Sequence, residues 1–205
     1  MRRAVFRFYA LKLSVILLAL SAAIASCAQP ISAAEIGAKL DNFQLTDVTG
    51  KIHSLRQYDG KAVILFFWSF KCPVSLIYVD RMEALYSKYG NRGVVLLGVS
   101  SGTNESQEEL RANASNLKIT FPILMDSEGE LMDKLGATHT PSVFILDQNA
   151  VLRYRGSPDN NKAPGDKGRV SYMDDAIDAI LSGRVISVPD TPVFGCSIRR
   201  KRPKE

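Results

Sequence analysis

The stretch AVILFFWSFKCPVS, residues 62–75, decides how this 205-residue chain folds. Residues 62–68 form an unbroken apolar run, which predicts a central strand buried on both faces of a sheet. Pro73 stands where the first turn of a helix tolerates proline. Apolar residues at helical spacing follow, with Gly90 after them, so a helix is expected over residues 73–89. A strand that leads directly into a helix predicts an α/β fold.

The segments on either side continue this alternation. Further strands are expected at residues 43–45, 52–55, 94–100, 142–146 and 151–155, and further helices at 106–117, 130–135 and 172–181. A Ser-x-x-Glu capping box beginning at Ser106 marks one helix start, and the last two strands form a hairpin. This order predicts a central mixed sheet flanked by helices. Beyond Arg184, Pro189, Pro192 and the loss of helical period predict an extended arm.

The first residues carry an export pattern. Basic residues precede a 13-residue apolar run at 13–25, which only Ser14 and Ser21 interrupt. A membrane-spanning helix needs roughly 20 residues, whereas the apolar core of a secretory signal has about 7–15. The pattern therefore predicts a signal segment, and an uncleaved membrane anchor is the alternative.

Cys27 ends the sequence Ile24-Ala25-Ser26-Cys27, which resembles a bacterial lipoprotein box, in which the cysteine becomes the lipidated first residue. Lipidation at Cys27 would hold an otherwise soluble domain at a membrane surface. Ordinary cleavage after Ala25 or Ala34 also fits the small residues here. We expect an exported protein of the periplasm or cell envelope, with lipid anchoring at Cys27 as one of these two alternatives.

Three regions are expected along the chain. They are an export segment with a spacer at 1–34, a folded domain at 35–183, and an extended arm with a basic tail at 184–205. The formal net charge of +5 resides at the two ends, and the body between them is neutral to acidic. This excludes a nucleic-acid-binding face. The tail is expected to be a solvated charge run, with contact to anionic lipid as the alternative.

Three cysteines, Cys27, Cys72 and Cys196, are present. An oxidising compartment favours paired thiols, and with Cys27 lipidated or removed the remaining pair is Cys72 with Cys196. Cys72 stands at an expected helix start, where unpaired N–H groups and the helix dipole bring a cysteine pKa to roughly 3.5–7.5. The ammonium of Lys71 would add to this effect if it points inward. A buried inert thiol is the alternative for Cys72.

Short segments in a fixed order carry a resemblance to a known family. They are Ile36-Gly37, Asn42-Phe43-Gln44-Leu45, Phe67-Trp68 with Cys72 four residues after Trp68, Pro122-Ile123-Leu124-Met125-Asp126, His139-Thr140-Pro141, Tyr154-Arg155-Gly156 and Gly195-Cys196-Ser197-Ile198. Together they resemble the redoxin branch of the alkyl hydroperoxide reductase/thiol-specific antioxidant (AhpC/TSA) superfamily. The resemblance covers about residues 35–198 and implies a thioredoxin-like fold.

The resemblance also implies roles for individual residues. Cys72 would attack a peroxide or a substrate disulfide, and Ser69 and Thr140 would orient groups at the site. Pro141 would have a cis peptide bond and would lie beside the active cysteine. Cys196 would act as the resolving thiol, within the chain or from a partner subunit, and a structural staple is the alternative role for it.

Some positions depart from the family pattern. Ser75 occupies the second cysteine position of a C-x-x-C motif, so the usual local disulfide cannot form. In the peroxiredoxin pattern P-x-x-x-(T/S)-x-x-C, Ser69 matches the hydroxyl position, but Leu65 stands in place of proline. Arg153 and Arg155 are candidates for the peroxiredoxin arginine, with surface solvation as the alternative.

Two hypotheses follow for the function. The first is a thiol-disulfide oxidoreductase or peroxiredoxin-like enzyme, in which Cys72 reduces a peroxide or disulfide, Cys196 resolves, and a thiol reductant protein restores both thiols. The second is a non-catalytic binding or scaffold module with a structural Cys72–Cys196 disulfide. Neither a metal nor a cofactor is expected, because no Cys/His cluster or phosphate loop has the required spacing.

Overall fold

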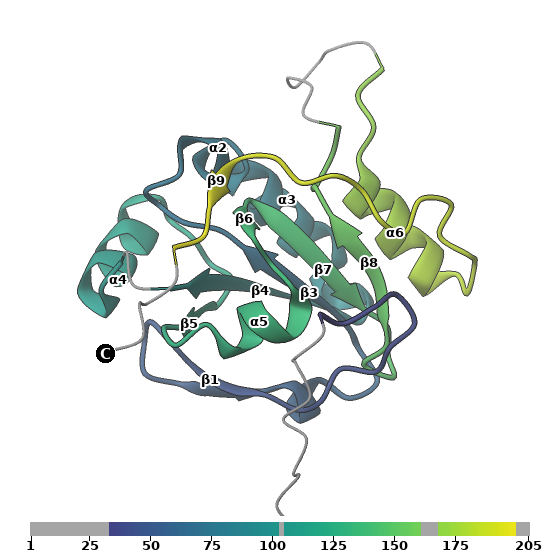
Figure 1. Cartoon of the computed structure of the whole chain (residues 1–205), viewed down its shortest axis with the longest axis horizontal. Coiled ribbons are helices and arrows are strands. Elements are labelled where there is room, and N and C mark those ends of the chain that lie inside the picture. Colours follow the sequence, from purple (N-terminus) through teal and green to yellow (C-terminus); the bar gives the residue numbers. More distant parts are fainter. Residues whose placement is uncertain (1–32, 103–104, 161–167, 200–205) are drawn as a thin grey trace, which may run out of the picture. The chain divides into compact units, whose positions relative to one another are not determined.

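The computed structural model describes residues 33–102, 105–160 and 168–199, which fold around one main sheet (Figure 1). The strands are β1 (Gln44–Asp47), β2 (Ile52–Ser54), β3 (Ala62–Phe67), β4 (Val94–Ser101), β5 (Ile123–Asp126), β6 (His139–Thr140), β7 (Ser142–Leu146), β8 (Leu152–Gly156) and β9 (Cys196–Ser197). The helices are α2 (Pro73–Leu76), α3 (Val79–Tyr89), α4 (Gln107–Asn116), α5 (Glu130–Leu135) and α6 (Tyr172–Leu181), with 3₁₀ turns η1 (Leu55–Tyr58) and η2 (Gly90–Arg92).

The main sheet is mixed and has the strand order β2-β1-β5-β4-β3-β7-β8. Strands β3, β4 and β5 run parallel, and every other neighbouring pair is antiparallel. β6 and β9 form a separate two-stranded sheet. The prediction of a central mixed sheet flanked by helices is therefore confirmed. Within the described residues, no helix is long and apolar enough to cross a membrane.

Strand β3 is buried throughout, as its apolar sequence predicts. Ile64 and Phe66 point into the core that α3 and α6 cover, whereas Leu65 and Phe67 point into the core that α5 covers. Full burial of a side chain of this size contributes about 1.5–3 kcal/mol. Packing on both faces thus fixes the end of β3, from which the chain enters α2.

The single helix predicted over residues 73–89 is wrong, because the chain breaks between α2 and α3. The Tyr78 N–H bonds to the carbonyl of Ser75, three residues back, at 3.0 Å. The Tyr78 side chain is fully buried, and its hydroxyl donates to the buried carboxylate of Asp159 at 2.7 Å. The tighter turn directs Tyr78 into the core and limits α2 to four residues.

Helix α3 ends at Tyr89 with Gly90 as its C-cap, as predicted, but Gly90 does not take the left-handed conformation usual for a glycine at a helix end. Gly90 keeps a helical backbone and begins η2, and Gly93 then adopts the left-handed conformation at φ 78° that ends the turn. The capping box predicted at Ser106 is present and opens α4. The segment 123–126, for which no strand was predicted, forms β5 between β1 and β4.

The extended arm, residues 184–205, is described as far as Arg199. The described part bonds first to β8 and then to β6. It lies along β8, where the Arg155 N–H donates to the Pro189 carbonyl at 3.0 Å and the hydroxyls of Tyr154 and Thr191 lie 2.7 Å apart. It then reaches β9 beside β6, as its yellow trace shows in Figure 1. The arm thus contains a short strand that its sequence did not predict.

Candidate active site

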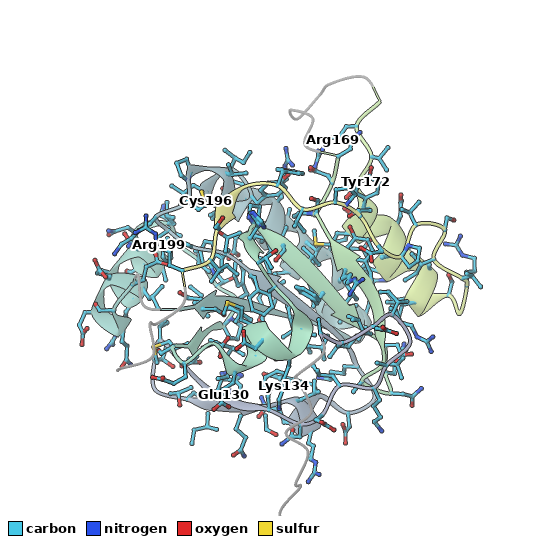
Figure 2. All side chains as sticks on the ribbon, viewed as in Figure 1. Glu130, Lys134, Arg169, Tyr172, Cys196 and Arg199 are labelled. Atoms are coloured by element: carbon cyan, nitrogen blue, oxygen red, sulfur yellow. The ribbon has the colours of Figure 1, made fainter. Side chains whose placement is uncertain are left out.

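Cys72 is the N-cap residue of α2, at the end of the loop that connects β3 to this helix. Its side chain is only 1% exposed, yet it borders a cavity of about 610 Å³. The residues lining this cavity are Ser69, Lys71, Cys72, Ser101, Glu105, Thr140, Cys196, Ser197, Ile198 and Arg199. Two of them, Cys196 and Arg199, are labelled on the arm in Figure 2. The arm therefore forms one wall of the cavity beside Cys72.

Thr140, which precedes Pro141, lies directly against the Cys72 thiol. The Thr140–Pro141 peptide bond is cis, as predicted. The Cys72 thiol donates to the Thr140 carbonyl oxygen at 3.2 Å. Across the β6–β9 pair, Thr140 is the direct partner of Cys196. The fold thus brings residues 72, 140, 141 and 196 together from three distant parts of the chain.

The ionisation of Cys72 depends on two opposing effects. Burial raises the pKa of the thiol, but hydrogen bonds to its sulfur outweigh burial and lower the pKa to about 7. The donors are the side chains of Cys196, Ser75 and Thr140 and the backbone N–H of Ser75. The lowered pKa raises the fraction of Cys72 that is thiolate at neutral pH, and thiolate is the nucleophilic form. Discrete donors take the place of the long-helix dipole that the sequence predicted, because α2 has only four residues.

Cys196 behaves in the opposite way to Cys72. Hydrogen bonding with the Cys72 side chain, burial and the neighbouring Cys72 charge raise the pKa of Cys196. Both cysteines are free thiols, and Cys196 is partly exposed. The pair is therefore asymmetric: the pKa of Cys72 is lowered, whereas the pKa of Cys196 is raised.

Other predicted residues lie near the cavity without contacting the Cys72 sulfur. The Ser69 hydroxyl lines the cavity and accepts from the Lys71 N–H at 3.0 Å. The Lys71 ammonium lies 3.2 Å from the Glu109 carboxylate. Cys27, the basic tail beyond Arg199 and most of the export segment lie outside the described residues.

The two candidate peroxiredoxin arginines have partners elsewhere. Arg153 lies 2.7 Å from Asp147 and Arg155 lies 2.7 Å from Asp190, and neither arginine lines the cavity beside the cysteines. Within the described chain, the arginine that does line it is Arg199. No group of three His, Cys, Asp or Glu side chains in the described residues could hold a metal ion.

Comparison with known proteins places this geometry in a family. The model of the AhpC/TSA family matches residues 36–155, which is more than half of the chain. The chain belongs to the AhpC/TSA family. It is 31% identical to the thiol-disulfide oxidoreductase ResA of Geobacillus thermodenitrificans over 122 residues, which cover 60% of this chain and 69% of ResA.

Solved structures agree with the fold of this AhpC/TSA protein. An uncharacterised conserved protein from Geobacillus kaustophilus superposes with a TM-score of 0.75 at 26% identity, covering 83% of this chain and 94% of that one. A putative thiol:disulfide interchange protein DsbE from Chlorobium tepidum superposes with a TM-score of 0.62 at 21% identity, covering 73% and 99%. The predicted thioredoxin-like fold and the coarse functional class, a thiol-dependent oxidoreductase, are therefore confirmed.

Sequence reasoning missed a role for Ser75 in this AhpC/TSA protein. Ser75 is fully buried, and hydrogen bonding with its side chain helps to lower the pKa of Cys72. The spacing carries a usable signal, because a residue three positions after an N-cap faces that N-cap on the first turn. Glu105 was also missed. It lines the cavity and accepts from the Phe70 N–H at 2.8 Å, which fixes the loop before Cys72.

The first prediction concerns the Ser75 hydroxyl. Replacing it (Ser75→Ala) removes a donor to the thiolate, so we expect the pKa of Cys72 to rise from about 7. A hydrogen bond to a charged group is worth about 1.5–3 kcal/mol, so the midpoint should move upward by about one pH unit or more. The pH dependence of iodoacetamide alkylation at Cys72 measures it. Ser69→Ala is the matched control, and an equal change in both variants would contradict the assignment.

Proposed function

We propose that this protein is an antioxidant-type thiol oxidoreductase in which Cys72 is the nucleophile and Cys196 the resolving thiol. The observation that carries the proposal is geometric: Cys72 and Cys196 line one cavity, the Cys72 thiol donates to the Thr140 carbonyl, and Cys196 is the strand partner of Thr140. A candidate nucleophile and the thiol that would displace its product therefore lie on the same cavity, on either side of Thr140. Ser75 takes over the position that a local partner cysteine has in C-x-x-C proteins.

The proposed reaction has two displacement steps. The Cys72 thiolate attacks a peroxide to give a sulfenic acid and release water or an alcohol, or attacks a disulfide to give a mixed disulfide and release one thiolate. Cys196 then attacks the Cys72 sulfur, losing its proton and displacing water or the second thiol. The substrate gains two electrons, and the Cys72–Cys196 disulfide holds the oxidised state. A dithiol reductant protein returns the electrons by exchange.

The proposed setting is outside the cytoplasm. The basic and apolar pattern of residues 1–34 supports export of the thioredoxin-like domain at 35–183, and lipidation at Cys27 would keep it at the cell envelope. An extracytoplasmic setting suits a cysteine pair that cycles between dithiol and disulfide. The arm at 184–205 belongs to the active unit, since it carries Cys196.

The second prediction tests the cysteine pairing. Reduced protein treated with one equivalent of hydrogen peroxide or oxidised glutathione should form an intrachain Cys72–Cys196 disulfide, which peptide mass mapping detects after alkylation. Cys196→Ser should instead stop at a sulfenic acid or a glutathione adduct on Cys72. Recovery of both cysteines in alkylated form from the oxidised wild-type protein would overturn the proposed function.

A scaffold with a permanent disulfide is the second candidate, supported by the β6–β9 pairing that holds the arm in place. The equilibrium reduction potential of the Cys72–Cys196 pair separates the two. Structural disulfides have potentials below about −300 mV, whereas reactive ones lie higher. Hydrogen bonding between Cys196 and the Cys72 side chain stabilises the dithiol form, so we expect the higher value.

A further inference from the structure

The end of the arm, Gly195–Arg199, forms a strap over Cys72. Its register is set on one side by β6, where Cys196 pairs with Thr140 and the Ile198 N–H donates to the Thr138 carbonyl at 2.9 Å. The strap pairs with β6 through main-chain hydrogen bonds. It therefore occupies the backbone groups of β6 that another extended chain would need in order to bind at this edge. Cys72 lies beneath it with 1% of its surface exposed.

Gly195 allows the strap to lie this close. Its φ of +129° is one that side-chain-bearing residues rarely adopt, and a Cβ there would stand 2.1 Å from the Thr140 carbonyl oxygen. That same oxygen accepts the Cys72 thiol. At the other end, a Cβ on Gly102 would stand 2.1 Å from the Arg199 carbonyl oxygen. The two glycines, Gly195 and Gly102, therefore allow the strap to lie close to the residues around Cys72.

The approach that the closed strap leaves to Cys72 is the cavity of about 610 Å³. A cavity of this volume suits a small molecule, and with 1% of its surface exposed Cys72 leaves little room for a second polypeptide chain. We propose that the strap makes Cys72 selective for small oxidants over protein disulfides, and that Gly195 is the residue that allows this selectivity. The inference rests on the proposed function and names its substrate class: a compact molecule with a cleavable O–O or S–S bond.

The chemistry balances for either small oxidant. The Cys72 thiolate forms an S–O bond while the O–O bond breaks, and hydroxide or alkoxide leaves and takes up a proton. With a small disulfide an S–S bond forms while another breaks, and a thiolate leaves. A protein disulfide undergoes the same exchange only after the strap has left β6, so the free energy of opening adds to its barrier.

The third prediction is measured in Cys196→Ser, which keeps the strap and leaves Cys72 unresolved. Rates of adduct formation at Cys72, followed by peptide mapping, are compared for hydrogen peroxide, oxidised glutathione and insulin. Each disulfide's rate is divided by its rate with free cysteine, which cancels its intrinsic reactivity. We expect the normalised rate for insulin to be lower than that for glutathione by about tenfold or more. The reason is that the strap must leave β6 before insulin can react, and the free energy of this opening adds to the barrier.

Strap variants complete the experiment in the same Cys196→Ser background. Gly195→Ala should raise the normalised insulin rate by about tenfold, and Ile198→Pro, which removes the N–H bonded to Thr138, should do the same by another route. Gly183→Ala is the matched control, because Gly183 also has a positive φ but has open space around a Cβ. It should leave the selectivity unchanged.

The outcomes separate the inference from the proposed function. Reaction of Cys72 with either small oxidant, combined with slow reaction with insulin, supports the inference and identifies the oxidant. Equal normalised rates for insulin and glutathione, no reaction with either small oxidant, or no effect of both strap variants would overturn it. Because Cys196 is absent from these measurements, they do not depend on disulfide formation. A wild-type protein that forms the Cys72–Cys196 disulfide without this selectivity would keep its proposed function.

Discussion

Replacing Cys72 with serine (Cys72→Ser) is expected to lower turnover of a small peroxide or disulfide by about 10³-fold or more. Serine keeps the size of the side chain, but its hydroxyl is not ionised at neutral pH, whereas the pKa of the Cys72 thiol is about 7. The hydrogen bonds that lower the pKa of Cys72 therefore cannot produce an anionic nucleophile in the variant. Steady-state turnover with a dithiol reductant in excess measures the loss.

Cys196→Ser distinguishes loss of the nucleophile from loss of resolution. With no reductant present, this variant should consume about one equivalent of oxidant per chain and keep the product on Cys72 as a sulfenic acid or mixed disulfide, since no second thiol displaces it. Cys72→Ser should consume none. Full turnover by Cys72→Ser would show that the nucleophile is elsewhere in the chain, and both the site and the proposed function would then be wrong.

Local patterns in the sequence predicted most of the framework. The strand predicted at 62–68 is observed as β3, which ends one residue earlier, at Phe67. The prediction succeeds because an apolar run of this kind suits a strand buried on both faces. The capping box at Ser106 placed the start of α4, and the predicted helices at 130–135 and 172–181 have the observed bounds of α5 and α6. Each of these signals lies within the element that it predicts.

Features that depend on distant residues could not be predicted in this way. The break before α3 depends on Tyr78 bonding to Asp159, which is 81 residues away in the sequence. β9 has two residues and becomes a strand only because β6 offers it an edge, so no periodicity marks it. The expected helix start marked Cys72, the cysteine count suggested Cys196 as its partner, and the resemblance to a family supplied Pro141. The place of Cys196 beside Cys72 depends on the course of the arm, which no local pattern predicts.

The carboxylate of Asp159 is expected to be the most costly polar group to remove outside the cavity. It is buried, and it accepts from the Tyr78 hydroxyl at 2.7 Å, from the Arg169 guanidinium at 3.1 Å and from the Arg81 guanidinium. Asp159→Asn keeps the shape but leaves two partly buried cations without their anion. Breaking a buried ion pair in this way costs about 3–5 kcal/mol, so we expect the free energy of unfolding to fall by about 3 kcal/mol.

Urea denaturation measures this loss as a lower midpoint at an unchanged slope. Asp178→Asn is the matched control, because Asp178 lies 3.7 Å from Arg92 and both of those side chains are about half exposed. A surface pair of this kind contributes less than about 1 kcal/mol. Equal losses in the two variants would contradict the argument. A larger loss for Asp159→Asn would mean that the buried Asp159 carboxylate, with the Tyr78, Arg81 and Arg169 side chains bonded to it, stabilises the folded domain.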